Sequence, residues 1–467
     1  MGHVVDCPRQ NEIGFYRPRK PWESSLYRLL EECFEEFERV YPERYAKKYG
    51  FWRPVIGKTV AAYLNCGDLR EGFARVRCPE CGHNMFVAYS CKRRYLCPSC
   101  HQKRTLITAI NIAENICESV PHRQFVWTMP KRFRLFFRFD RNLLRKLPGL
   151  AWETTLEVYR VVLNRDDIVP GMITGIQTHG QIANWHPHLH SLTTYGAFTA
   201  DGTFIPLPDD LSTTPFLRIW EEKVFKLLLN EKKITQDVVD QIRSWRHSGF
   251  SVDKSVALAA GDTAGIERLV QYMVRCPFSL DRIISRSADG KIVYRAEKTS
   301  CQPFPILGNE RLLKGIPRNF EVFDPLDFIA EITQHIPSPD MQMIRYNGYY
   351  SNRARGDRAK ARNSVDSAEP KPIIDDEDTP YRKLTRLRWA QLIQRVYEID
   401  PMCCPECGAQ MRIISFVGRH NQPEVVDKIL NHCGLEGRPA SRAPPSTPSP
   451  EQLEFEYVEI DEFLMAL

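Results

Sequence analysis

The sequence predicts an α+β protein in which helices flank an antiparallel sheet. Segments with apolar residues at the three-four spacing of amphipathic helices alternate with short runs rich in β-branched and aromatic residues. The clearest pair of predicted strands, residues 171–182 and 188–197, is separated by a short connection around residues 183–185. Such a short connection joins antiparallel neighbours, because parallel strands need a long crossover.

Composition limits the classes of protein that the chain can belong to. Its 467 residues are enough for about three domains, and 43% hydrophobic with 26% charged residues is ordinary globular composition. The sequence has neither a run of about eighteen apolar residues nor an N-terminal signal core, so we expect no membrane span and no secretion. Fifteen cysteines, several of them as Cys-x-x-Cys, indicate metal ligands in the cytoplasm rather than disulfides.

The net charge of +6 is a modest excess, and its distribution is more informative than its size. Basic residues cluster at 92–94 and 103–104, and they alternate with aromatic residues over 131–138. Mixtures of cations and aromatic rings suit phosphates and unstacked bases. The same clusters could also be solvated faces.

The first 65 residues are predicted to be a helical region. Its apolar positions recur at helical spacing, with glutamates opposite them. These positions are Leu26, Leu29, Leu30, Cys33, Phe34 and Phe37.

Residues 66–120 are predicted to be a zinc-binding domain of the ribbon type. Cys78 and Cys81 form one Cys-x-x-Cys knuckle, and Cys97 and Cys100 form a second. Two such knuckles complete the tetrahedral thiolate set that Zn²⁺ prefers, so these four cysteines are the simplest ligand set. Cys91 could replace one of the four or belong to a second site.

Residues 121–355 are predicted to be one domain that contains the sheet. We expect helices at residues 106–120, 141–165 and 216–246, and a strand at residues 123–130 that proline ends. The strands at 171–182 and 188–197 follow the second of these helices.

The most informative stretch is Trp185-His186-Pro187-His188-Leu189-His190. Residues two apart on a strand point to the same face, so His188 and His190 would converge while Leu189 turns into the core. Two imidazoles and one further ligand could hold a divalent cation with positions left open for a phosphate. Pro187 cannot donate to a β-ladder and would mark the first residue of the strand, which favours His188 and His190 over His186. Alternatively, the histidines are polar surface.

A second informative segment is a helix that begins near Asp262 or Thr263. Its apolar stripe would consist of Ile266, Leu269, Val270, Met273 and Val274. At about 100° per residue, Arg268, Tyr272 and Arg275 fall together on the opposite side. A tyrosine packed for bulk alone should sit in the stripe, whereas this one lies with two arginines, where a nucleophile aimed at a phosphate would be.

The order of these features resembles the HUH endonucleases, in which His-hydrophobic-His binds a metal and a later helical tyrosine attacks DNA. More narrowly, the chain is similar to transposases of the insertion sequence ninety-one type, from about Cys66 to Val417. The stretches that carry the resemblance are RYLCPSCHQKR, HPHLH, QYMVRCPFS and HIPSPDMQMIRYNGYYSNR.

The resemblance implies a ferredoxin- or RRM-like sheet and cleavage of single-stranded DNA at the ends of a mobile element, in association with the nucleoid. Mg²⁺ or Mn²⁺ would be held by His188, His190 and Gln177, although Gln177 could equally be sheet surface. Tyr272 would form a 5′-phosphotyrosine. Arg275 and Arg268 would neutralise phosphate charge.

One position departs from the family pattern, which often has a second tyrosine four residues before the first. Arg268 stands there, so successive cleavages must use a second protomer of a homodimer, a hydroxyl or water. Two other functions stay open. One is a replication initiator or relaxase with the same chemistry, and the other is a zinc-dependent DNA-binding protein without catalysis.

The C-terminal part is predicted to be less regular. Residues 345–350, followed by Arg353, Arg355 and Arg358, suit stacking on single-stranded bases, or form a core-packed aromatic turn beside a solvated basic run. Residues 356–379 are expected to be a charged linker, 380–436 a small domain and 437–467 a disordered tail. Cys404 and Cys407 could form a second zinc site with His420, His432 or Cys433.

Overall fold

The computed structural model describes residues 14–15, 20–286, 290–296, 302–303, 317–365, 399–400 and 402–435. The expected tail at 437–467 and most of the expected linker lie outside these residues. The chain divides into two compact units. The sheet unit comprises Cys33–Ile56 and Arg94–Glu369, and the ribbon unit comprises Met1–Glu32, Gly57–Arg93 and Pro370–Leu467.

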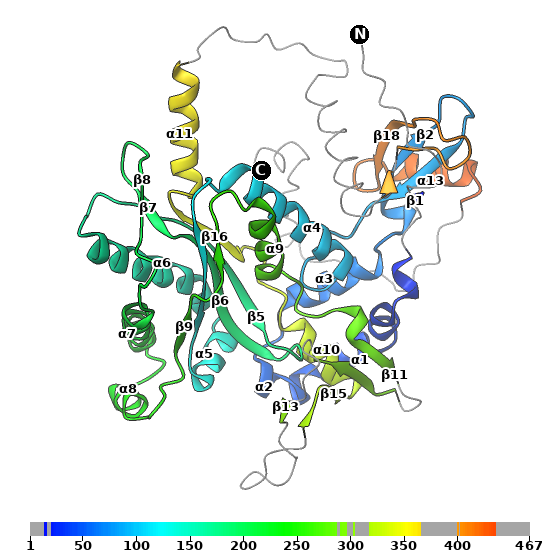
Figure 1. Ribbon diagram of the computed structural model, residues 1–467. Coiled ribbons are helices and arrows are strands. Elements are labelled where there is room, and N and C mark those ends of the chain that lie inside the picture. Colours follow the sequence, from blue (N-terminus) through cyan, green and yellow to red (C-terminus); the bar gives the residue numbers. More distant parts are fainter. Residues whose placement is uncertain are drawn as a thin grey trace. The chain divides into compact units, whose positions relative to one another are not determined.

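The sheet unit is built on an antiparallel sheet of six strands (Figure 1). The strand order is β10-β4-β6-β5-β16, and β9 also pairs with β4. The strands are β4 (His122–Thr128), β5 (Gly171–His179), β6 (Trp185–Thr194), β9 (Ser251–Asp253), β10 (Ala257–Leu258) and β16 (Ile344–Gly348). Together with its flanking helices, this sheet confirms the predicted α+β class.

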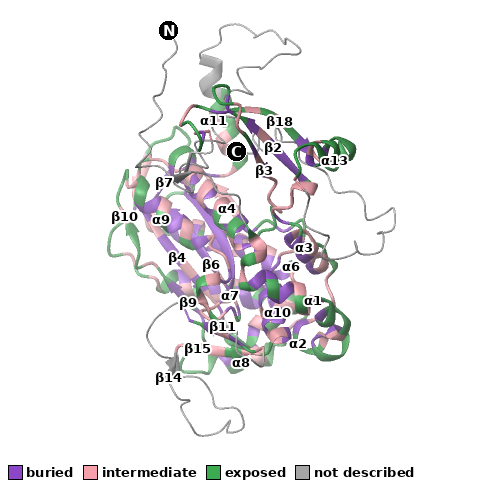
Figure 2. Ribbon diagram, turned by 90° about the vertical axis from the view of Figure 1, so that its right-hand side faces the viewer, coloured by how far each residue is buried: buried purple, intermediate pink, exposed green. Residues whose placement is uncertain are grey.

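Helices cover both faces of this sheet. On one face Leu189 and Ile176 pack with side chains of α6 (Asn142–Leu163) and α7 (Thr214–Asn230). On the other face Leu192 and Ile173 pack against α4 (Pro98–Asn111), the π-helical turn Ile112–Ile116 and α9 (Thr263–Met273). The central strands β4 and β6 are therefore largely buried (Figure 2). Alternate residues of β5 and β6 thus face two different cores.

The sheet unit also contains further helices, several short strands and two 3₁₀ turns. The helices are α2 (Ala46–Tyr49), α5 (Arg134–Phe139), α8 (Gln236–Arg243), α10 (Pro325–Thr333) and α11 (Asn352–Val365). The strands are β7 (Gly196–Phe198), β8 (Phe204–Pro206), β11 (Ile283–Arg286), β12 (Ile292–Arg295), β13 (Gln302–Pro303), β14 (Pro317–Arg318) and β15 (Phe320–Phe323). Single 3₁₀ turns lie at Lys131–Phe133 and Leu280–Arg282.

Several predicted boundaries are corrected by the structure. The helix expected at 216–246 is two helices, α7 and α8, because Lys232 between them adopts a left-handed conformation with φ of 52°. The helix expected at 106–120 begins earlier, at Pro98, where proline is favoured in a first turn. The charged segment expected as a linker from residue 356 is helical as far as Val365.

The described part of the first 65 residues is largely helical. The helices are α1 (Ser25–Arg44) and α3 (Pro54–Leu64), in addition to α2. The apolar stripe of α1 is buried at Leu26, Leu29, Leu30, Phe34 and Phe37, and Cys33 is half-buried.

The ribbon unit contains an antiparallel sheet in the order β18-β2-β3. Its strands are β2 (Gly72–Arg77), β3 (Asn84–Ala88) and β18 (Arg412–Gly418), and α13 (Pro423–His432) packs on it through Val426 and Leu430. The unit also includes the short strands β1 (Gly14–Phe15) and β17 (Ile399–Asp400) and the 3₁₀ turns Pro21–Glu23 and Leu69–Glu71. The C-terminal segment, expected as a domain of its own, therefore supplies a strand to the sheet of the zinc-binding region.

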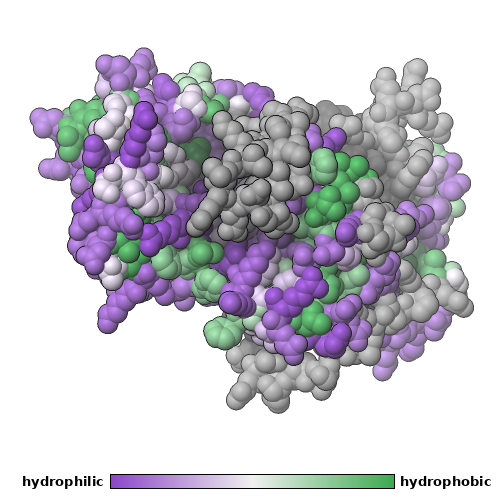
Figure 3. All heavy atoms as spheres, turned by 90° about the horizontal axis from the view of Figure 1, so that it is seen from below, coloured by the Kyte–Doolittle hydropathy of each residue, from purple (hydrophilic) through white to green (hydrophobic). Residues whose placement is uncertain are grey.

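Among the described residues no helix is both long and apolar enough to cross a bilayer. The face drawn in Figure 3 is mostly hydrophilic in its described part, and hydrophobic residues gather there only in small separate patches.

Candidate active site and metal centres

His188 and His190 lie on the face of β6 that packs against α9. Gln177 and Gly175 of β5 pair directly with His188 and His190. The two imidazole centroids are 4.8 Å apart. Leu189 points to the opposite core and is fully buried. The convergence predicted from the two-residue spacing is therefore confirmed.

The predicted start of this strand is wrong. β6 begins at Trp185 and Pro187 lies inside it. The pairing of β6 with β4 ends at Leu189, and its register with β5 shifts between Gln177 and His179. Pro187 has no N–H to donate, and it falls in this irregular end of the strand, where a ladder hydrogen bond is not required.

The ring nitrogens of the pair have different partners. His188 Nδ1–H donates to the backbone carbonyl of His186 at 2.7 Å, which leaves Nε2 with its lone pair. Gln124 Nε2 lies 2.7 Å from His190 Nδ1 and donates to it. His190 Nε2 is buried and has no hydrogen-bond partner in the part of the chain that the structure describes. In this orientation the proton of the neutral ring lies on Nε2. Rotation of the Gln124 amide by 180° would let its Oε1 accept from Nδ1–H, and Nε2 would then have a lone pair to offer.

Burial keeps both imidazoles neutral at neutral pH. Desolvation is the main cause that lowers the pKa of His188 to about 4 and that of His190 to about 2. Nearby groups contribute to these low pKa values: Arg134 and then Arg275 for His188, and His188 and then Arg275 for His190. A neutral imidazole is the form that binds a metal ion.

Gln177 connects the histidine strand to the tyrosine helix. Its Nε2 donates to the backbone carbonyls of Tyr272 at 2.8 Å and Met273 at 2.9 Å, at the end of α9. Because both amide hydrogens go to carbonyls, Oε1 must point away from them. This Oε1 is buried and has no hydrogen-bond partner among the described residues. A Cβ at Gly175 would lie 3.2 Å from the Met273 carbonyl oxygen, so glycine allows α9 to approach the strand closely.

Tyr272 lies beside the histidines and is accessible. The residue is 43% exposed, and the centroid of its ring is 5.3 Å from that of His190 in an edge-to-face arrangement. The guanidinium of Arg275 lies 4.5 Å from the centroid of the Tyr272 ring. Arg268, one turn earlier on α9, is exposed. Arg275 follows the helix rather than belonging to it, because α9 ends at Met273.

The helix itself follows the sequence pattern closely. Asp262 is the N-cap, and its carboxylate accepts from the backbone N–H of Gly265 at 2.8 Å. The stripe of Ile266, Leu269, Val270 and Met273 is buried. Tyr272 is therefore the position on this helix at which a large aromatic ring is left outside the core.

Helix α4 holds the segment that follows Tyr272. His101 Nε2–H donates to the Val274 carbonyl at 2.8 Å, and Thr105 Oγ1 donates to the same oxygen at 3.1 Å. His101 Nδ1 accepts from the backbone N–H of Tyr95 at 3.0 Å. Both nitrogens of His101 are thus engaged, so neither lone pair is left for a metal ion despite the place of this residue next to Cys100.

Three other tyrosines, Tyr346, Tyr349 and Tyr350, lie in the aromatic and basic segment near residue 350, and their rings or hydroxyls have partners of their own. The hydroxyl of Tyr350 lies 2.8 Å from His122 Nε2 and accepts from the backbone N–H of Glu118 at 3.1 Å, and its ring is fully buried. Tyr349 stacks on Phe198 with centroids 3.7 Å apart. The guanidinium of Arg355 lies 5.6 Å from the centroid of the Tyr346 ring.

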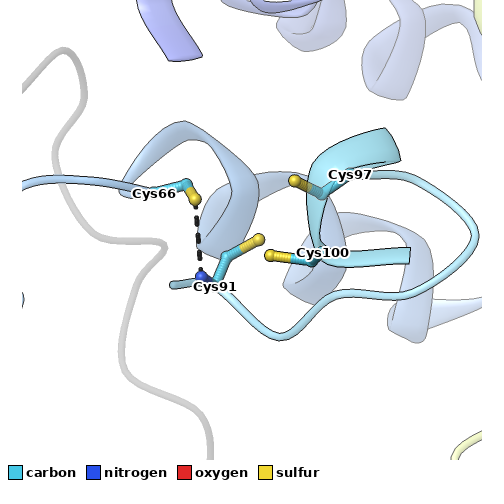
Figure 4. A group of neighbouring side chains, drawn as sticks. All are labelled: Cys66, Cys91, Cys97 and Cys100. Atoms are coloured by element: carbon cyan, nitrogen blue, oxygen red, sulfur yellow. Dashed lines mark hydrogen bonds between the residues drawn. The ribbon is translucent and has the colours of Figure 1, made fainter. Parts of the chain in front are cut away.

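The cysteines form two groups that differ from the predicted set. Cys78 and Cys81 lie with Cys404 and Cys407, whereas Cys97 and Cys100 lie with Cys66 and Cys91. In each group the four sulfur atoms are within 4.8 Å of one another. In the second group the sulfurs of Cys97 and Cys100, at the start of α4, point toward Cys66 and Cys91 (Figure 4).

Each group combines cysteines that are far apart in the sequence, so the grouping could not be predicted from local spacing. Spacing along the chain cannot show which knuckle completes which tetrahedron, since the partners are set by the fold. Cys66, in the turn after α3, gave no knuckle signal of its own. Cys91, predicted as a possible ligand, is brought into the group with Cys97 and Cys100.

Comparisons with known proteins show which proteins this chain is similar to. Residues 171–358 match a family model described as a putative transposase, and residues 36–129 match one described as a transposase zinc-binding domain. The transposase for insertion sequence element IS801 of Pseudomonas savastanoi pv. phaseolicola is 24% identical over 379 residues, which cover 78% of this chain and 84% of that protein. The putative transposase y4qJ of Sinorhizobium fredii (strain NBRC 101917 / NGR234) is 23% identical over 413 residues, which cover 83% and 96%. No solved structure matches the chain.

The two family models include the cysteine-rich region and the strands and helix that carry His188, His190 and Tyr272. Both relatives are similar to this chain over most of its length. The chain therefore belongs to the transposases of the insertion sequence ninety-one family.

Proposed function

We propose that this transposase cleaves and rejoins single-stranded DNA through a 5′-phosphotyrosine on Tyr272. The observation that carries the proposal is that two buried polar atoms without partners lie beside one accessible phenol. His190 Nε2 and Gln177 Oε1 have no hydrogen-bond partner among the described residues, and Tyr272 is exposed beside them. Buried polar atoms without partners are costly, so such a pair next to a nucleophile supports a binding site.

The residues fit a divalent cation. His188, His190 and the side-chain oxygen of Gln177 would hold Mg²⁺ or Mn²⁺, because two neutral imidazoles and an amide oxygen leave coordination positions open for phosphate oxygens. When bound, the ion would polarise the scissile phosphate and stabilise the charge that develops on its oxygens. The backbone carbonyl of His186 and the amide of Gln124 orient the two imidazoles through their Nδ1 atoms.

The chain's own residues account for the group transfer. The Tyr272 oxygen forms a bond to phosphorus and loses its proton, while the bond from phosphorus to the 3′ oxygen breaks and that oxygen takes up a proton as a 3′-hydroxyl. The hydroxyl can later attack the phosphotyrosine, so the reaction reverses without ATP. Arg275, whose guanidinium lies over the tyrosine ring, and exposed Arg268 would neutralise phosphate charge.

A single tyrosine shapes the reaction sequence. Arg268 occupies the place of a second tyrosine one turn earlier, so a second cleavage requires the Tyr272 of another protomer, a hydroxyl or water. A homodimer would supply the first of these.

The cysteine group next to this region would bind zinc. Cys66, Cys91, Cys97 and Cys100 offer four sulfurs, a closed set typical of a structural Zn²⁺ site. Cys97 is the N-cap of α4, the helix whose His101 and Thr105 hold the residue after the tyrosine helix. Zinc at this position would fix the start of that helix.

The experiment is incubation of the full chain with single-stranded DNA from the ends of the element, with Mg²⁺, Mn²⁺ or a chelator of divalent cations. We expect nicking and a covalent protein–DNA adduct with either metal and neither product with the chelator. Binding without nicking under all three conditions would favour a non-catalytic DNA-binding protein. Equal cleavage of element ends and of plasmid origins would favour a replication initiator or relaxase.

A further inference from the structure

The sequence Cys-Pro-Glu-Cys-Gly occurs twice in the chain, at residues 78–82 and at residues 404–408. The zinc-binding family model ends at residue 129 and therefore includes only the first copy. The two copies are separated by more than three hundred residues, yet both belong to the ribbon unit.

The two copies adopt the same backbone turn. The N–H of Gly82 donates to the Cys78 carbonyl at 3.1 Å, and the N–H of Gly408 donates to the Cys404 carbonyl at 2.9 Å. The φ angles of the two glycines are 76° and 73°, a left-handed conformation that favours glycine.

A second hydrogen bond closes each turn. The N–H of Cys78 donates to the His83 carbonyl at 2.8 Å, and the N–H of Cys404 donates to the Ala409 carbonyl at 2.9 Å. Two knuckles with the same hydrogen bonds and the same special glycine each present two sulfurs in the same way.

The knuckles face one another. Cys78 Sγ lies 3.5 Å from Cys407 Sγ, and Cys81 Sγ lies 3.6 Å from Cys404 Sγ. All four sulfurs lie within 4.8 Å of one another. In a tetrahedral zinc site with Zn–S bonds of about 2.3 Å, neighbouring sulfurs are about 3.8 Å apart. The four positions therefore match a zinc tetrahedron.

Residues near each knuckle pack into one small hydrophobic core. Cys78 and Cys404 are buried together with Val76, Met85 and Met411. β18, which follows the second knuckle, pairs antiparallel with β2, which precedes the first, from Arg412↔Arg77 to Gly418↔Gly72. Zinc between the knuckles would be part of the folding of this core, because a thiolate site of this kind does not exist in the unfolded chain.

We propose that Cys78, Cys81, Cys404 and Cys407 form a second structural zinc site, a ribbon closed by the C-terminal segment of the chain. The site clamps residues 402–435 onto the strands of the N-terminal zinc-binding region. It is independent of the proposed phosphotyrosine chemistry, which uses residues of the sheet unit.

Cysteine labelling in the full-length wild-type protein tests the site without any variant. Cys81, Cys407 and Cys433 are exposed, so all three are accessible to an alkylating reagent. Because thiols differ in intrinsic reactivity, the rate at each position is compared with and without a zinc chelator. We expect Cys433 to be labelled at once, and Cys81 and Cys407 to be labelled only after a zinc chelator is added. Mass spectrometry of the peptides gives the extent of labelling at each position.

Two results would overturn the site. One is labelling of Cys81 and Cys407 in zinc-replete protein at the same rate with and without the chelator. The other is protection that a reductant removes and a chelator does not, which would indicate disulfides instead of zinc.

A second experiment counts the zinc ions bound per chain, by native mass spectrometry, in the wild-type protein and in matched variants. Cys404→Ser and Cys78→Ser should each lower the number of zinc ions per chain by one. The double variant should also lower it by one, because both residues share one ion. Cys403→Ser, at the neighbouring residue outside the group, should keep the wild-type number. Loss of two ions in the double variant, or no loss in Cys404→Ser, would contradict the proposal.

Discussion

The histidine–tyrosine site and the Cys78/Cys81/Cys404/Cys407 site differ in how completely their polar atoms are engaged. In the first, His190 Nε2 and Gln177 Oε1 are buried without partners among the described residues, and Tyr272 is accessible beside them. In the second, four sulfurs lie within 4.8 Å of one another and form a closed set. A closed set suits a structural metal ion, whereas a catalytic metal needs open positions for its substrate. Buried polar atoms without partners therefore support a site that binds a substrate or a catalytic metal ion, and a closed set of four sulfurs supports a structural metal ion.

The largest expected effect comes from Tyr272→Phe, which removes only the nucleophilic oxygen. Covalent adduct with single-stranded DNA should fall by roughly a thousand-fold or more, since no other group replaces a lost nucleophile. The ring is partly exposed, so the free energy of unfolding should change by less than about 1 kcal/mol. Denaturing gels and urea unfolding measure the two effects. Tyr346→Phe is the control and should form adduct normally.

The second expected effect concerns the open metal set. His190→Ala or His188→Ala should reduce metal-dependent nicking by roughly a hundred-fold or more, while binding of single-stranded DNA persists because phosphate contacts lie elsewhere. His186→Ala is the matched control, because the group that orients His188 is the backbone carbonyl of His186, which alanine keeps. Nicking at the wild-type rate by His190→Ala would remove the histidines from the active site.

A smaller effect is expected from Gln177→Glu, which tests the hydrogen bonds between strand β5 and the end of helix α9. A carboxylate cannot donate to the carbonyls of Tyr272 and Met273, so these two acceptors lose their partner. The free energy of unfolding should fall by about 1–3 kcal/mol in metal-free buffer. Gln241→Glu is the control. Gln241 is an exposed residue of α8, and glutamate keeps the oxygen that accepts from Arg132, so the free energy of unfolding should change little. Equal stability of the two variants in urea titrations would show that the hydrogen bonds of Gln177 contribute nothing.

The smallest expected effect is that of Thr105→Val on α4. It removes one of the two hydrogen bonds to the Val274 carbonyl and leaves that of His101. We expect a loss of about 1 kcal/mol in unfolding free energy. A fall in the rate of adduct formation with unchanged DNA affinity would show that α4 positions the tyrosine. A change in stability alone would limit Thr105 to a structural role.

The parts of the site that could be predicted from sequence are those set by local periodicity. The two-residue period of a strand placed His188 and His190 on one face, and the helical period left Tyr272 outside the stripe of Ile266 and Leu269. These relations hold within one element and do not depend on which element packs beside it.

The parts that could not be predicted depend on packing between elements. Gln124 reaches His190 because β4 lies beside β6 in one particular register, and that register is not readable from either strand alone. His101 stands next to Cys100 in the sequence, yet its ring nitrogens bind the backbone of Tyr95 and Val274, a role that no local pattern indicates. The cysteine groups combine knuckles by their place in the fold, which spacing along the chain did not reveal.

The most direct test of the central claim is peptide mapping of the covalent adduct formed by the wild-type protein with single-stranded DNA. We predict that the nucleotide label lies on the peptide with Tyr272 and on no other. The hydroxyl of Tyr350 is already hydrogen-bonded in a buried position, and Tyr349 is stacked on Phe198. Label on Tyr346, Tyr349 or Tyr350 would place the active site elsewhere and contradict the account.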